Sequence, residues 1–208
     1  MKHSRQQSGF TLVEIAIVLV IVGLLLGAVL KGQELIFNSK VKSTFSLGKE
    51  FSAAINAYQD RYKALPGDDA QAAARFPNAN PVPTNGNNNM VVPVSTMNCA
   101  AGNVTENCQV FAHLRAGGFV SGTGSASAVT PFGGTTSIAS SAGFFPGTGN
   151  TLALGLAQQA LNHKIGSAID TGFDDGDPAR GTFRCRNLAA YNMATPETNL
   201  PDVCSIQM

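Results

Sequence analysis

The sequence predicts an α+β protein in which a long N-terminal helix packs on a small antiparallel sheet domain with a disulfide-closed C-terminal loop. Residues 10–30 are almost wholly apolar, and residues 31–64 continue with helical spacing and no proline. Residues 121–150 include 18 glycine, serine or threonine residues among scattered large apolar ones, which is typical of short strands and turns. We expect a basic leader over 1–9, a membrane helix over 10–30, its amphipathic continuation over 31–64 and a head domain over 65–208.

The apolar run from Phe10 to Leu30 is 21 residues long and contains one ionisable side chain, Glu14. About 20 apolar residues in a helix span the hydrocarbon core of a bilayer. An acid inside such a span is a functional position by default, because burying its charge in lipid is unfavourable. A secretory signal peptide fits worse, since its cleavage site would follow the apolar run. An uncleaved signal anchor, with Glu14 at headgroup level, is the remaining alternative.

Residues 8–14 read Ser-Gly-Phe-Thr-Leu-Val-Glu and stand between the basic leader and the apolar run. This stretch resembles the prepilin signal of type IV pilins and type II secretion pseudopilins. The resemblance implies that prepilin peptidase cuts after Gly9 and methylates the new N-terminus at Phe10. The new amine would lie at i, i+4 spacing from Glu14. Glu14 is therefore expected to serve assembly, with neighbouring subunits exchanging amine and carboxylate in a filament.

The same resemblance implies the partners and the location of the chain. The expected partners are other pilin-like subunits, prepilin peptidase, an inner-membrane assembly platform and, before assembly, membrane lipid. The subunit is expected in the bacterial inner membrane with its head outside the cytoplasm, and afterwards in a periplasmic or cell-surface filament. Many pilins bend this helix at a proline, and the absence of one before Pro66 leans towards a minor pilin or pseudopilin. A membrane-tethered binding module is the alternative from another functional class.

Charge and cysteine content restrict the function further. The formal net charge is +1, and without Lys2 and Arg5 of the leader the chain has 12 basic and 13 acidic side chains. This balance gives no electrostatic case for a nucleic-acid partner.

In the expected orientation the four cysteines face an oxidising compartment, where disulfides persist. Of three possible pairings, sequence proximity favours Cys99–Cys108 with Cys185–Cys204, and no C-x-x-C pair supports the competing zinc site.

Local signals predict the elements that follow the long helix. Leu65-Pro66-Gly67-Asp68 ends it, because the residue before proline resists helical geometry and glycine suits the cap. Further on we expect a short helix over 69–76, a loop over 77–98, a helix over 106–119, short strands within 121–150, a helix over 151–169, and a strand from 182 that leads into the C-terminal loop. The segment around His113 resembles a packing helix of some pilin-like proteins that share the Leu-Pro-Gly-Asp stop.

Four aspartates, Asp170, Asp174, Asp175 and Asp177, lie within eight residues. Calcium takes six to eight oxygen ligands, commonly from carboxylates and carbonyls of a flexible loop. A calcium site is therefore one interpretation, although the EF-hand pattern is absent. The alternative is an Asp-Gly turn whose side chains cap backbone amides. The sequence has no G-x-S-x-G elbow, phosphate loop or catalytic Cys–His signature, so we do not predict an enzyme.

Overall fold

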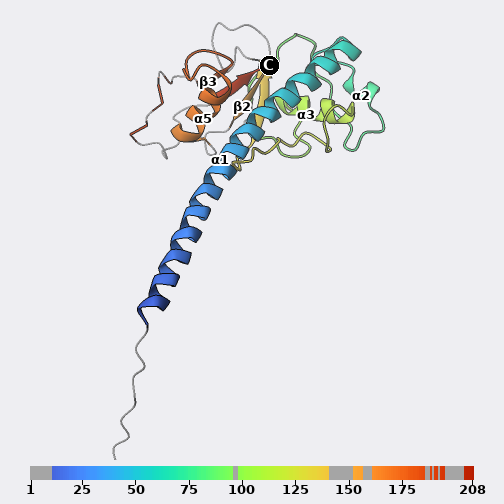
Figure 1. The fold of residues 1–208 in the computed structure, drawn as a ribbon. Helices are drawn as coiled ribbons and strands as arrows, with labels where there is room; N and C mark the ends of the chain where they lie inside the picture. Colours follow the sequence, from blue (N-terminus) through green and yellow to red (C-terminus); the bar gives the residue numbers. More distant parts are fainter. Residues whose placement is uncertain are drawn as a thin grey trace, which may run out of the picture. The chain divides into compact units, whose positions relative to one another are not determined.

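The computed structural model describes residues 11–95, 98–140, 152–156, 161–185, 188, 190–191, 193–194 and 204–208. Its helices are α1 (Leu12–Tyr62), α2 (Ala72–Arg75), α3 (Glu106–Ala116) and α5 (His163–Phe173), and its strands are β1 (Thr136–Ser140), β2 (Leu152–Leu156), β3 (Phe183–Cys185) and β4 (Cys204–Gln207) (Figure 1). The chain divides into two compact units, Met1–Ser39 and Lys40–Met208. The leader, with the cleavage residues Gly9 and Phe10, lies outside the described residues.

The described part of the first unit consists of Thr11 and the N-terminal part of α1. This part of the helix is long and apolar enough to cross a membrane, judged by length and composition. Its large apolar side chains between Leu12 and Leu30 are exposed, as expected for a helix surrounded by lipid rather than by protein. The prediction of one uninterrupted helix is confirmed within the described residues, because α1 runs without a break to Tyr62.

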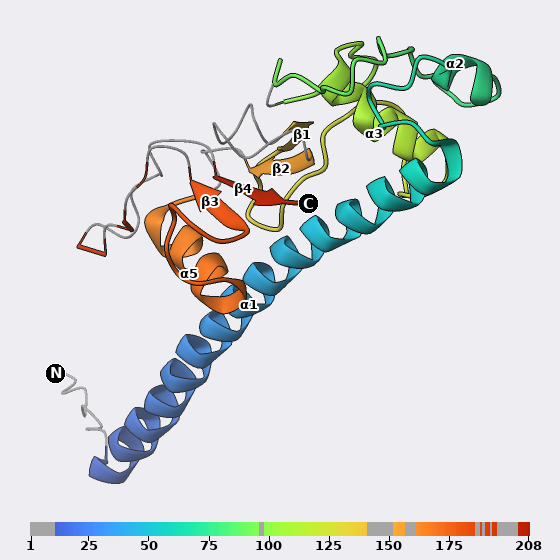
Figure 2. The ribbon, with the colours of Figure 1, turned by 90° about the horizontal axis from the view of Figure 1, so that it is seen from above.

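The second unit contains a four-stranded antiparallel sheet with the strand order β1-β2-β4-β3 (Figure 2). Ile138, Leu154, Ile206 and Phe183 form a row across the four strands, since each is the register partner of the next. All four side chains are buried, with at most 5% of their surface exposed. This apolar row is the centre of the core of the second unit.

The C-terminal part of α1 packs on this core through one face. Phe51 meets Phe111 of α3 edge to face at 5.4 Å, and Phe45 stacks on Phe173 of α5 at 4.2 Å between ring centroids. Between these rings, a Cβ atom at Gly48 would lie 2.9 Å from Cδ1 of Ile206. Glycine at this position therefore lets β4 approach the helix closely. The amphipathic pattern predicted over 31–64 corresponds to this buried face, whose members are Val41, Thr44, Gly48, Phe51, Ala54, Ile55 and Tyr58.

The helix predicted over residues 151–169 is wrong. Residues 152–156 form strand β2, and a helix begins only at His163. The leucine and alanine content of this segment favours a helix, but Leu152, Leu154 and Leu156 alternate as in a strand. Pairing of β2 with both β1 and β4 outweighs the local helix propensity.

The predicted C-terminal loop contains a strand, because residues 204–207 form β4. The disulfide Cys185–Cys204 joins this strand to β3 at a register pair, and Cys99–Cys108 links the preceding loop to α3. All four cysteines are buried. The short helix expected over 69–76 has only one turn, α2, and the helix expected over 106–119 ends at Ala116.

Candidate functional site

Glu14 lies in the first turn of α1 and is held there by Thr11. The Thr11 backbone N–H and hydroxyl both donate to Glu14 Oε2, at 2.9 Å and 2.8 Å. In return, the Glu14 backbone N–H donates to the Thr11 hydroxyl oxygen at 3.3 Å. This reciprocal arrangement is a capping box, which satisfies two of the free N–H groups at a helix start. The Thr-x-x-Glu spacing at residues 11–14 could have predicted it from the sequence.

The capping box orients the Glu14 carboxylate but does not neutralise it. Thr11 supplies hydrogen bonds and no positive charge, and none of the ion pairs among the described residues includes Glu14. By contrast, the next acidic residue along α1, Glu34, forms an ion pair with Lys31 at 2.7 Å. Glu14 thus presents an oriented, uncompensated negative charge at the start of an exposed apolar helix. Such a group can receive a cation supplied from outside the described residues.

At the other end of α1, after Tyr62, two polar clusters hold the segment in which the chain reverses direction. The Tyr58 hydroxyl donates to Asp69 Oδ2 at 2.8 Å, and Arg75 Nε lies 2.9 Å from the same oxygen. Burial raises the pKa of Tyr58, and the hydrogen bond to Asp69 acts in the same direction, so the phenol stays protonated as the donor. The second cluster centres on His113, whose ring bridges Gly67 and Thr84. Both clusters join residues far apart in the sequence, and no local pattern predicts them.

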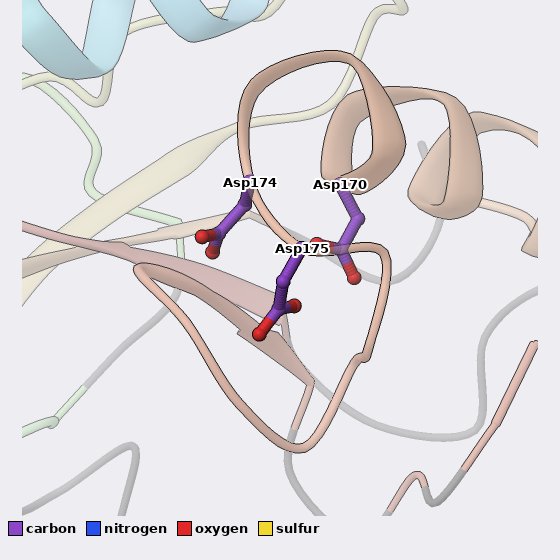
Figure 3. A group of neighbouring side chains, drawn as sticks. All are labelled: Asp170, Asp174 and Asp175. Carbon is purple, nitrogen blue, oxygen red and sulfur yellow. The ribbon is translucent and has the colours of Figure 1, made fainter.

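Three of the four clustered aspartates converge at the end of α5. One carboxylate oxygen from each of Asp170, Asp174 and Asp175 lies within 4.8 Å of the others (Figure 3). Asp170 is fully buried, and burial raises the pKa of its carboxyl, with Asp174 and Asp175 adding to the shift against its hydrogen bonds. Asp177 is not a member of this group. It caps Ala179 N–H at 3.0 Å and lies 3.4 Å from Arg180.

Protein donors already use much of the capacity of these carboxylates. Asp170 accepts from Gly176 N–H at 3.0 Å and from the Tyr191 hydroxyl at 2.9 Å. Backbone N–H groups also donate to Asp174 at 2.6 Å and to Asp175 at 2.9 Å. The second oxygens of Asp174 and Asp175 accept no hydrogen bond from the described residues, so each keeps capacity for a further partner. Carbonyls and water would have to complete the six to eight ligands of calcium.

Comparison with protein families gives one match. Residues 4–30 match the model of the prokaryotic N-terminal methylation motif. A search of curated proteins and a search of solved structures found no match to this chain. The matched segment contains Gly9, Phe10 and Glu14, and it includes the capping box at the start of α1.

The match to the methylation motif and the observed fold point to the same kind of protein. The long apolar helix, the small antiparallel sheet and the Cys185–Cys204 disulfide fit the α+β fold of pilins. The motif indicates a structural protein, and the motif and the apolar helix together indicate membrane anchoring. The chain carries a type IV pilin-like prepilin signal, and the recognition made from residues 8–14 is confirmed.

Proposed function

We propose that this protein is a structural subunit of a type IV pilus-like filament, as a pilin or minor pilin. It is made as a prepilin, cut after Gly9, N-methylated at Phe10 and polymerised through α1. The methylation motif over residues 4–30 is the observation that carries this proposal. The uncompensated Glu14 at the start of an exposed apolar helix supports it.

Charge pairing has a specific role in such an assembly. Moving α1 from lipid into a filament core gains little from the hydrophobic effect, because lipid tails are as apolar as the side chains they leave. Close packing and polar contacts must therefore favour assembly. In this proposal the amine of Phe10 from one subunit meets the Glu14 carboxylate of its neighbour, which neutralises both. The partners are then other pilin-like subunits, prepilin peptidase and an inner-membrane assembly platform.

Processing and assembly can be tested separately. Intact mass and N-terminal sequencing of the membrane-extracted protein should show the loss of residues 1–9 and the gain of one methyl group. Two substitutions in α1 then test assembly. Glu14→Ala should be processed normally but excluded from purified filaments. Glu34→Ala is the matched control, since Glu34 is an exposed acid of α1 paired with Lys31, and it should assemble. Retention of residues 1–9, or equal incorporation of both variants, would contradict the proposal.

Two alternatives make different predictions for the same samples. A pseudopilin of a type II secretion system would be processed identically, but loss of the protein would block protein secretion rather than surface filaments. A membrane-tethered binding module would use α1 only as an anchor. It would remain a monomer in the membrane, and Glu14→Ala would leave its behaviour unchanged.

We also propose that Asp170, Asp174 and Asp175 bind a calcium ion. The convergence of their carboxylates, with free oxygens on Asp174 and Asp175, supports it. Calcium should then raise the melting temperature of the detergent-solubilised protein relative to chelator, and Asp175→Asn should reduce that shift. Asp60→Asn, on an exposed acid outside the cluster, should not change it. Equal melting temperatures with calcium and with chelator would leave only the turn-capping role.

A further inference from the structure

Arg115, in the last turn of α3, lines a cavity of about 160 Å³ in the second unit. Residues from separate parts of the chain line the same cavity, including Asn80, Pro81, Ala112, Ala116, Gly122 and Thr123. The wall combines apolar groups with neutral hydrogen-bonding groups, and the only charged side chain on it is Arg115. An anion that enters this cavity therefore meets no acid on its wall.

The protein satisfies only part of the hydrogen-bonding capacity of this guanidinium. Arg115 Nη1 donates to the carbonyl oxygens of Gly124 and Ala126, at 2.9 Å and 2.6 Å. Arg115 Nε is buried and has no hydrogen-bond partner among the described residues. Gly122 lies beside this nitrogen, since a Cβ atom there would be 3.1 Å from Nε. Because Nε has almost no accessible surface, a ligand cannot reach it. Nη2, which is not buried and has no hydrogen-bond partner among the described residues, is the nitrogen left for a ligand.

The positive charge of Arg115 also lacks a counter-ion. No ion pair among the described residues includes it. Burial lowers the pKa of its guanidinium, and no neighbouring acid opposes that shift. The carbon atom of the guanidinium lies over the aromatic ring of Phe111, at 5.4 Å from the ring centroid. Removing a cation from water without a counter-charge is unfavourable, so an anion bound beside it would be stabilised.

The size and charge of the cavity restrict the ligand. An apolar cavity of about 150 Å³ holds a molecule as large as benzene, whereas drug-sized ligands need about 300–1,000 Å³. A nucleotide is therefore too large for it. One guanidinium matches a planar, singly charged carboxylate, with which arginine forms its most directional pairs. We propose that this cavity binds a single carboxylate group, with Arg115 as its counter-ion and Asn80 and Thr123 as neutral hydrogen-bonding groups.

Acetate is the simplest probe of this site. The full-length protein in detergent micelles is titrated with sodium acetate against sodium chloride at constant pH and ionic strength, while NMR follows the Arg115 Nε–H and the Gly122 and Thr123 amides. Acetate should produce a saturable shift with a millimolar dissociation constant, and chloride should not. Arg61→Gln, which removes an exposed arginine of α1, should keep the response, and Arg115→Gln should lose it.

A second variant separates ligand binding from a purely structural role of Arg115. Ala116→Leu fills the cavity from its wall while leaving Arg115 and its bonds to Gly124 and Ala126 in place. The folded variant should lose the acetate shift. If the wild-type protein shows no saturable shift, or if Ala116→Leu responds to acetate as the wild type does, the proposal is overturned. Arg115 would then serve only to hold the loop over residues 122–126.

The carboxylate has two possible sources, a free small molecule or an acidic side chain of a second copy of this chain. The second source rests on the proposed filament, and the same titration on purified filaments distinguishes them. If a neighbouring copy occupies the cavity, acetate should no longer shift the Arg115 signal in filaments. A retained response assigns the site to a free carboxylate. Because the micelle titration requires no assembly, failure of the filament proposal and failure of the carboxylate site give different results.

Discussion

The backbone N–H of Gly67 donates a hydrogen bond to Nδ1 of His113, at 3.0 Å and across 46 residues of sequence. The opposite ring nitrogen, Nε2, lies 2.8 Å from the carbonyl oxygen of Thr84. Since Nδ1 must accept, the proton is on Nε2 and the ring is neutral. Gly67 has a φ of +92°, and a Cβ there would lie 2.6 Å from Val110. The glycine of the helix stop and the histidine of α3 therefore form one clamp, which a doubly protonated ring cannot make.

Replacing His113 should destabilise the second unit. His113→Leu removes the acceptor of Gly67 and the donor to Thr84, and a buried group left unpaired costs about 1–3 kcal/mol. His113→Asn places an amide oxygen near the position of Nδ1, so it should cost less. Chemical denaturation of the two variants measures the difference. Equal losses for both would show that packing, rather than the Gly67 bond, dominates at this position.

Acidification should weaken the same clamp. Burial lowers the pKa of His113 below its ordinary value of 6.5, despite opposing effects of Thr84, Asp69 and Asp68. The unfolded chain then binds this proton more readily than the folded one, so stability is complete above about pH 6.5 and falls as the pH drops towards the folded pKa. A buried acid whose pKa is raised, such as Asp170, makes the opposite contribution to stability, which decreases as the pH rises. The difference in unfolding free energy between wild type and His113→Asn isolates the histidine, and a difference constant from pH 8 to 5 would contradict this prediction.

Tyr58→Phe should destabilise the reversal after α1. The substitution leaves Asp69, which is 2% exposed, without its hydroxyl donor while Arg75 remains. Loss of a buried hydrogen bond to a charged group corresponds to about 1.5–3 kcal/mol. Tyr62→Phe is the matched control, because Tyr62 belongs to the same aromatic cluster and donates no hydrogen bond to the described residues. Thermal unfolding should show a clear decrease only for Tyr58→Phe.

The two disulfides should differ in their contribution to stability. They close loops with sequence separations of 9 and 19 residues. Chain-entropy arguments assign them about 2.5 and about 3 kcal/mol respectively. Paired Cys→Ala substitutions should therefore lower the midpoint of denaturation more at Cys185 and Cys204. The reverse order would indicate that the link from Cys99 to Cys108 in α3 limits the cooperativity of the fold.

Thr11→Val should loosen the start of α1 without removing Glu14. The variant loses the hydroxyl that donates to Glu14 Oε2 and accepts from the Glu14 N–H, whereas Thr11→Ser keeps both bonds. Amide hydrogen exchange in micelles should become several-fold faster at Glu14 in the valine variant. Identical exchange in the two variants would show that the membrane environment, and not the capping box, holds the first turn.

The sequence predicted the parts of this protein that are continuous in the chain. The length of the apolar run and the helical spacing of the apolar residues after it predicted α1. A contiguous motif predicted the prepilin signal around Glu14. Local propensity was misleading for Leu152–Leu156, because only pairing with β1 and β4 makes this segment a strand. The His113 clamp and the Arg115 cavity join distant residues, so no local pattern reveals them. Within the aspartate cluster, spacing could not show that Asp177 turns towards Arg180 instead.

The position of β4 in the sheet determines the order in which the second unit can be completed. β4 lies between β2 and β3, yet it follows both of them in the sequence. During synthesis from the N-terminus, β3 has no strand partner among the described residues and β2 keeps an open edge until residues 204–207 emerge. Open strand edges promote wrong pairing with other chains. A nascent chain therefore leaves both strands open to pairing with other chains until its central strand arrives.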